Sequence, residues 1–223
     1  MPEKEEEIGT VVSNLEGPSP NQVDFVVLNG KVHRGQFVEI PYSEGTLIGM
    51  VTNVLKTNKY FERADAVKEF EAQGTKLFEQ FPVHDWEYIM AVTTPLGVFT
   101  NENKIKRTTF PPSPGSKVFN AQPESLVRFL GFDEEKGLEL GNMEFHPVKV
   151  KLNLSRLLQK HFAILAQSGS GKSHFISCLL EELLTRKKEN GRVAIVAFDV
   201  HGEYTNFAEP VMDAKYTDYS KHT

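Results

Sequence analysis

Hydrophobic residues in the first third of the chain come in short runs, as expected for β-strands. These runs cover residues 10–12, 23–28, 35–40 and 46–51. Residue types that favour turns separate them, namely Gly17-Pro18-Ser19-Pro20, Asn29-Gly30 and Ser43-Glu44-Gly45. Short, evenly spaced strands with turns between them predict a small antiparallel β-barrel.

A different pattern interrupts the strands at residues 60–81. Hydrophobic residues there recur at helical spacing, with Gly74 in between: Val67, Phe70, Leu77, Phe78 and Phe81. We interpret this segment as a helical insertion that packs on the barrel. A strand pattern resumes at residues 86–92, and Pro95-Leu96-Gly97 separates it from a further strand at Val98.

The stretch before residue 160 predicts one more helix and one more strand. Residues 111–116 are rich in proline and form an extended loop, and residues 123–131 suit a short helix with the acidic Glu124 in its first turn. Hydrophobic residues alternate with polar ones over 148–154, which indicates a strand with one solvated face. We therefore expect a barrel domain over residues 1–152 and a second domain over 153–223.

The second domain has the pattern of an α/β fold. A short apolar run, 162–165, precedes a glycine-rich loop, and a second apolar run, 193–198, comes later. The intervening helix has one apolar stripe and an i,i+4 pair, Glu182 and Arg186. Strand, loop, helix and strand in this order predict a parallel sheet with a right-handed crossover. The expected fold class is α+β overall: the antiparallel barrel, then the start of a P-loop (RecA-like) α/β domain.

Composition and charge narrow the possible partners. With 39% hydrophobic and 25% charged residues the chain is an ordinary globular protein, and no run is long enough for a membrane span. Cys178 is the only cysteine, which indicates a reducing compartment and a cytoplasmic location. Residues 151–223 carry 10 basic and 8 acidic residues, a balance of +2; because the whole chain carries −5, residues 1–150 carry −7. An acidic barrel repels a phosphate backbone, so any DNA contact belongs to the second half.

The glycine-rich loop has the composition of a triphosphate site. Gly169 and Gly171 can adopt the backbone angles that let several N–H groups converge on phosphate oxygens. Lys172 adds a cation for the β- and γ-phosphates, and the Ser173 hydroxyl is a hard ligand for Mg²⁺. We therefore predict that ATP and Mg²⁺ bind at Ser168, Gly169, Ser170, Gly171, Lys172, Ser173 and His174.

Two features leave alternatives open. Ala166 stands where such loops usually begin with glycine, and a glycine- and serine-rich loop could instead merely cap the helix. Asp199 and Glu203 follow the second apolar run, at the carboxyl end of a predicted strand, where ligands bind in parallel sheets. They either take part in the nucleotide site or stabilise the sheet edge or a subunit contact. We assign no catalytic residue.

Two motifs resemble those of the HerA branch of the HerA/FtsK ATPases. They are His161–Ser173 and Asp199-Val200-His201-Gly202-Glu203-Tyr204, where Val200 replaces the usual proline of that family. The resemblance implies a hexameric, ring-shaped, ATP-driven DNA translocase or helicase that acts with a NurA-type nuclease in the resection of DNA ends. The barrel would form a collar on the ring and dock the nuclease.

The resemblance also bears on what this chain can do alone. Family members run to roughly twice this length, and the water-activating acids and the arginine from a neighbouring subunit have no counterpart before Thr223. We expect this chain to bind nucleotide weakly or not at all and not to hydrolyse it. One alternative is an oligomerising or nuclease-docking barrel that carries an incomplete, inactive ATPase segment. Another is a P-loop kinase or transport ATPase that acts on a small molecule.

Overall fold

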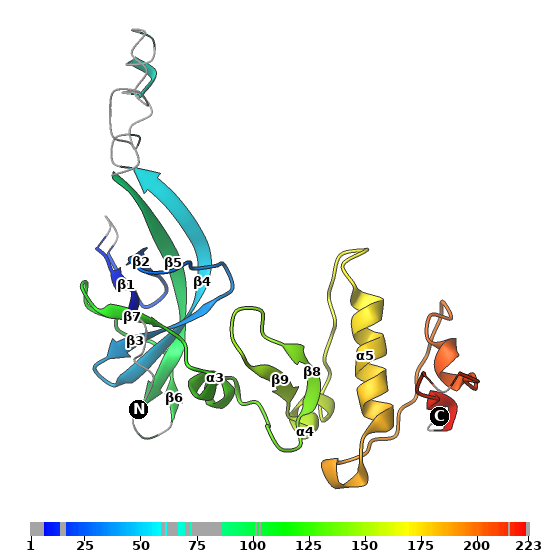
Figure 1. Cartoon of the computed structure of the whole chain (residues 1–223). Coiled ribbons are helices and arrows are strands. Elements are labelled where there is room, and N and C mark those ends of the chain that lie inside the picture. Colours follow the sequence, from blue (N-terminus) through cyan, green and yellow to red (C-terminus); the bar gives the residue numbers. More distant parts are fainter. Residues whose placement is uncertain are drawn as a thin grey trace. The chain divides into compact units, whose positions relative to one another are not determined.

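The chain forms two compact units, which Figure 1 shows in a computed structural model. The structure describes residues 7–13, 17–58, 61, 67–69, 72, 86–100, 102, 104–213 and 215–221. The first unit comprises Met1–Gln122 with Glu144–His146, and the second comprises Pro123–Met143 with Pro147–Thr223. Most of the insertion predicted at 60–81 lies outside the described residues. The domain boundary predicted at residues 152–153 stays a prediction, because compact units need not coincide with domains that fold alone.

The first unit is a closed antiparallel β-barrel, as predicted. Six strands follow one another around it in the order β2-β1-β7-β3-β4-β5, and β2 also pairs with β5, which closes the barrel. The strands are β1 (Glu7–Val11), β2 (Val23–Val27), β3 (Phe37–Tyr42), β4 (Gly45–Asn58), β5 (Glu87–Thr100) and β7 (Lys117–Asn120). A short strand, β6 (Ile105–Lys106), adds to the free edge of β5. Closure removes the exposed edges that an open sheet would present.

Strands β4 and β5 form a long hairpin of 14 residues on each side. The break expected at Pro95–Gly97 is wrong, because β5 runs through these residues without interruption. Gly49 pairs with Pro95 and Ile48 pairs with Gly97, so that Leu96 is an extra residue in a β-bulge. A bulge accommodates proline within a strand, since the ladder is already interrupted there.

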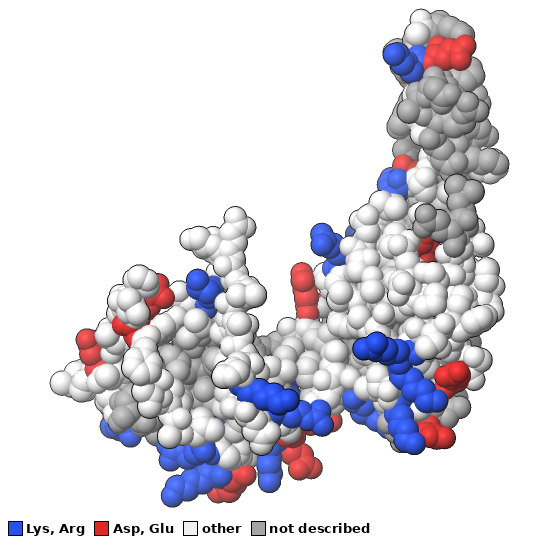
Figure 2. Space-filling view, turned by 180° about the vertical axis from the view of Figure 1, so that it is seen from behind, with Lys and Arg blue, Asp and Glu red and all other residues white. Residues whose placement is uncertain are grey.

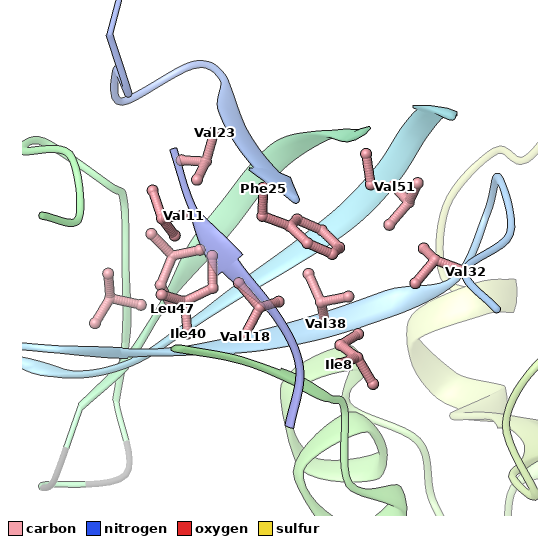
Figure 3. Close-up of a cluster of buried hydrophobic side chains, with 12 residues drawn as sticks. Ile8, Val11, Val23, Phe25, Val32, Val38, Ile40, Leu47, Val51 and Val118 are labelled. Carbon is pink, nitrogen blue, oxygen red and sulfur yellow. The ribbon is translucent and has the colours of Figure 1, made fainter. Parts of the chain in front are cut away.

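The barrel interior is filled by hydrophobic side chains from all six strands, as Figure 3 shows. Phe25 is the largest of them, and its ring lies between the surrounding strands without exposure to solvent. Full burial of a side chain of this size stabilises a fold by about 1.5–3 kcal/mol. The other buried members are Ile8, Val11, Val23, Val32, Val38, Ile40, Leu47, Val51, Ala91, Val98 and Val118.

Residues 144–146 pack on the barrel although they lie far from it in sequence. The backbone N–H of Phe37 donates to Nε2 of His146 at 2.9 Å, and the His146 side chain is buried. Beside it, the rings of His33 and Phe145 stack with centroids 4.9 Å apart. Burial lowers the pKa of His146, and an interaction with the Ala121 backbone opposes this effect.

The second unit contains a two-stranded sheet and several helices. Its strands are β8 (Leu138–Asn142) and β9 (Lys149–Leu152), and its α-helices are α3 (Pro123–Leu130), α4 (Leu154–Leu158) and α5 (Lys172–Thr185). Three short 3-10 helices follow: η3 (Lys188–Asn190), η4 (Thr205–Ala208) and η5 (Tyr219–Lys221). Helix α3 and strand β9 confirm the predicted elements, and β9 pairs with β8 rather than with a barrel strand.

Helix α5 packs through one side of its predicted apolar stripe. Leu179 and Leu183 are buried against Leu138 of β8, with Leu154 and Leu157 at the edge of this cluster. The predicted Glu182–Arg186 ion pair is present at 3.0 Å. Arg186 also donates to the carbonyl groups of Lys136, Gly137, Asn190 and Gly191, which connects the end of α5 to the turn before β8.

The two apolar runs that flank α5 do not form the parallel sheet that we predicted. Residues 162–165 and 193–198 are assigned to no strand, and Leu165 and Phe198 are each 91% exposed. Parallel strands need hydrogen-bonded neighbours and cover on both faces, because their side chains are apolar on both sides. Within the part of the chain that the structure describes, neither run has such neighbours. The start of a P-loop α/β domain therefore remains a prediction.

Candidate functional site

The glycine-rich loop has the backbone geometry that its sequence predicted. Gly169 and Gly171 have φ angles of 80° and 90°, in the left-handed region that glycine adopts without strain. A turn forms at the start of the loop, where both the N–H and the hydroxyl of Ser170 donate to the carbonyl of Gln167, at 3.2 and 2.7 Å. The loop then leads directly into α5, with Gly171 as its N-cap.

The beginning of α5 presents donors to solvent. The first helical bond runs from the N–H of Phe175 to the carbonyl of Gly171 at 2.9 Å. The N–H groups of residues 172–174 precede this bond, so the helix itself supplies no acceptor for them. No side chain caps this end of the helix, and the Lys172 side chain is exposed there. N–H groups without a helical acceptor, the helix dipole and an ammonium group are features that favour anion binding.

The structure brings the predicted metal ligand and one predicted acid together. The Ser173 hydroxyl donates to Oε2 of Glu203 at 2.8 Å, across 30 residues of sequence. Ser173 lies in the first turn of α5, and Glu203 lies in the turn before η4. The sequence named Glu203 and Asp199 together as possible acids of the nucleotide site but gave no basis for choosing between them, because the choice depends on how the segment after 193–198 folds back toward α5.

The second predicted acid, Asp199, is directed toward backbone groups of its own loop. Its Oδ2 accepts a hydrogen bond from the N–H of Tyr204 at 2.8 Å. This hydrogen bond lowers the pKa of Asp199, burial raises it to a smaller extent, and the N–H groups of Glu203, Gly202 and His201 lower it further. Asp199 is therefore a carboxylate that organises the turn 199–204.

His174 also lies in the first turn of α5, and its ring is directed toward the next turn of the same helix. Its Nε2 lies 3.7 Å from the sulfur of Cys178, one helical turn further on. Cys178 is a free thiol and is half-buried. The loop residues Ser168 to Ser173 and Glu203 thus share one region, whereas the His174 ring is directed toward Cys178.

On the side of the molecule that Figure 2 shows, the described surface residues carry charges of both signs, with Lys and Arg side chains interspersed with Asp and Glu. Within the described ranges, no three His, Cys, Asp or Glu residues are grouped so that they could hold a metal ion by themselves. A divalent cation at this loop would therefore need oxygen atoms from Ser173 and from the nucleotide. None of the helices that the structure describes has the length and hydrophobicity required to cross a membrane.

Comparison with known proteins agrees with the motifs. Residues 138–222 match the family model for the central domain of the helicase HerA. The chain is homologous to HerA-type helicases. It is 28% and 31% identical to two probable helicases of Methanocaldococcus jannaschii, over 88% and 76% of this chain. It is 27% identical, over 82% of its length, to the DNA double-strand break repair helicase HerA of Pyrococcus furiosus.

The chain spans about a third of the length of these HerA-type relatives, namely 38%, 31% and 32%. The match to the HerA central domain begins at β8 and includes α5, the glycine-rich loop and the turn with Asp199 and Glu203. The resemblance inferred from the two motifs is therefore confirmed, and it reaches beyond them into β8 and β9.

Proposed function

We propose that this chain binds ATP with Mg²⁺ and serves an ATP-driven DNA translocase or helicase of the HerA type. The observation that carries the proposal is the loop Ser168–Ser173, whose two glycines adopt left-handed angles ahead of an uncapped helix. The match of residues 138–222 to the HerA central domain supports the same conclusion.

Each loop residue has a defined task in this proposal. The backbone N–H groups from Gly169 to Ser173 would donate to phosphate oxygens, and Lys172 would neutralise charge on the β- and γ-phosphates. Ser173 supplies an oxygen to Mg²⁺, which accepts hydroxyl and carboxylate ligands. The bound cation would offset phosphate charge during hydrolysis. Hydrolysis itself needs a water-activating acid and an arginine that we do not assign in this chain.

The biological role is proposed by analogy with the relatives, which include DNA double-strand break repair helicases. We propose that six copies form a ring, that the ring drives DNA through its centre, and that the barrel docks a NurA-type nuclease for end resection. The acidic balance of residues 1–150 suits a barrel that faces protein better than one that faces DNA.

A second candidate function is favoured by the contrast between the two units. The barrel has a closed core of buried side chains, whereas most residues of the apolar runs beside α5 are exposed. The chain could accordingly act as an oligomerising or nuclease-docking barrel with an inactive ATPase segment. This alternative predicts nuclease binding that is unaffected by ATP and by substitution of Lys172, which a pull-down with the full chain measures.

Nucleotide binding is the direct test. Calorimetry of the full chain with Mg·ATP should detect weak binding, and Lys172→Ala should abolish it, because the substitution removes the only side-chain cation of the loop. Lys187→Ala is the matched control: Lys187 is also exposed but follows the opposite end of α5, about 20 Å away along the helix. Equal affinities of the wild type and Lys172→Ala would remove the assignment.

A further inference from the structure

The turn with Asp199 and Glu203 contains two carboxylates whose surroundings differ. Asp199 is half-buried and accepts a hydrogen bond from the backbone N–H of Tyr204, whereas Glu203 is exposed and accepts one from a hydroxyl group of another segment. Both residues belong to one sequence motif, and the motif alone gives no reason to assign them different roles. The structure gives them different partners and therefore allows different roles.

The pair Ser173 and Glu203 has the spacing of two adjacent metal ligands. The Ser173 hydroxyl oxygen and Oε2 of Glu203 are 2.8 Å apart. Mg²⁺ binds oxygen atoms at about 2.1 Å in an octahedron, so neighbouring ligand oxygens lie about 3 Å apart. Replacing one hydrogen bond by a shared cation thus requires little movement of either side chain. Both oxygens are also of the hard type that Mg²⁺ prefers.

Asp199 is placed to fix the position of Glu203 rather than to bind the cation. Its Oδ2 accepts a hydrogen bond at 2.8 Å from the N–H of Tyr204, which is the residue directly after Glu203. The N–H groups of His201, Gly202 and Glu203 also act on this carboxylate. A carboxylate whose oxygen accepts a backbone N–H of its own turn is directed toward the backbone, and it holds the turn in one conformation.

We propose that Ser173 and Glu203 together hold the divalent cation of a bound nucleotide, and that Asp199 is a positioning residue that keeps Glu203 beside Ser173. This inference rests on the proposed function, because it assumes that the loop 168–173 binds a nucleotide. It goes further in assigning separate roles to the two acids and in predicting how strongly binding depends on the cation.

The test compares ATP binding by the full chain in the presence of Mg²⁺ and in the presence of EDTA. The wild type should bind Mg·ATP more tightly than metal-free ATP. Glu203→Gln should weaken the binding of Mg·ATP about tenfold, the scale of loss for a group that supports a metal site, and leave metal-free ATP unaffected. Glu209→Gln is the control, because Glu209 is an exposed carboxylate of the same segment that follows η4.

Two variants of Asp199 separate positioning from direct metal binding. Asp199→Asn keeps an oxygen that can accept the N–H of Tyr204, so it should retain most of the preference for Mg²⁺. Asp199→Ala removes that acceptor and should lose the preference as Glu203→Gln does. Electron paramagnetic resonance of Mn²⁺ with ADP gives a readout that needs no turnover: the bound-metal signal should be lost in Glu203→Gln and kept in Asp199→Asn.

The outcomes distinguish this inference from the proposed function. If the wild type binds no ATP with or without Mg²⁺, the proposed nucleotide site is wrong. If it binds ATP and Lys172→Ala does not, but Glu203→Gln keeps the full preference for Mg²⁺, only the role of Glu203 is wrong. A loss of the Mn²⁺ signal in Asp199→Asn equal to that in Glu203→Gln would overturn the positioning role.

Discussion

Arg186 should be one of the most important residues for the stability of the second unit. Its side chain is 3% exposed, and its guanidinium group donates to Glu182, to the carbonyl of Gly137 in the turn before β8 and to that of Asn190 at the end of η3. We predict that Arg186→Met, which keeps the hydrophobic stem but removes every donor, destabilises the packing of α5 on β8. The exposed N-terminal part of α5 should change less.

The magnitude follows from what the substitution leaves behind. Removing one partner of a buried ion pair commonly costs about 3–5 kcal/mol, because the remaining polar groups lose their partners. The cost here should be near the lower limit, about 3 kcal/mol. Glu182 is 32% exposed and regains water, and the carbonyls of Gly137 and Asn190 border an open polar cleft. Glu182→Gln should cost less than about 1 kcal/mol, as for a partly exposed pair.

Hydrogen exchange of the amides in α5, followed by mass spectrometry, measures this effect locally. A loss of about 3 kcal/mol corresponds to exchange faster by roughly a hundredfold, since each 1.4 kcal/mol is a factor of ten. Lys187→Ala, the exposed neighbour, is the control and should leave exchange unchanged. If Arg186→Met accelerates exchange less than about fivefold, the buried hydrogen bonds of Arg186 do not stabilise this unit.

Two further predictions concern the barrel. Burial lowers the pKa of His146, so the unfolded chain binds the histidine proton more tightly than the folded chain does. The free energy of unfolding should therefore keep its full value above about pH 6.5 and fall by up to about 1.4 kcal/mol per pH unit below it. His146→Gln, which keeps an acceptor for Phe37, should remove that part of the pH dependence in urea titrations. Gly45→Ala should destabilise the barrel more than Gly115→Ala, because a Cβ at Gly45 would overlap the carbonyl of Phe99, whereas one at Gly115 meets nothing within 4 Å. Equal melting temperatures for these two alanine variants would contradict the expected overlap at Gly45.

The barrel and the helices α3 and α5 were predictable because their signals are local. Turn residues such as Ser43-Glu44-Gly45 and the alternation along 148–154 specify strands regardless of what packs on them. The apolar stripe of α5 likewise predicted the helix and the side that Leu179 and Leu183 bury. The left-handed angles of Gly169 and Gly171 were predictable for the same reason, since they follow from residue type and spacing.

The errors occurred where the structure depends on neighbours. The apolar runs 162–165 and 193–198 have strand composition, but a strand forms only when another strand supplies hydrogen bonds along its edge. Pro95–Gly97 looked like a turn and became a bulge, because β4 continues alongside and holds the chain extended. In both cases composition described a preference, and pairing partners determined the result.

By itself the sequence determined several of the barrel strands, though not β7, together with the left-handed angles of Gly169 and Gly171 and helix α5, because turn chemistry and periodicity act over a few residues. Only the tertiary structure decided what their side chains meet. It buried Arg186, which the sequence presented only as half of an i,i+4 pair, an interaction that on an isolated helix is worth about 0.2–0.5 kcal/mol. It also placed Glu203 rather than Asp199 beside Ser173. Such contacts join residues up to about 50 positions apart, and their strength depends on exclusion of water, which no local pattern encodes.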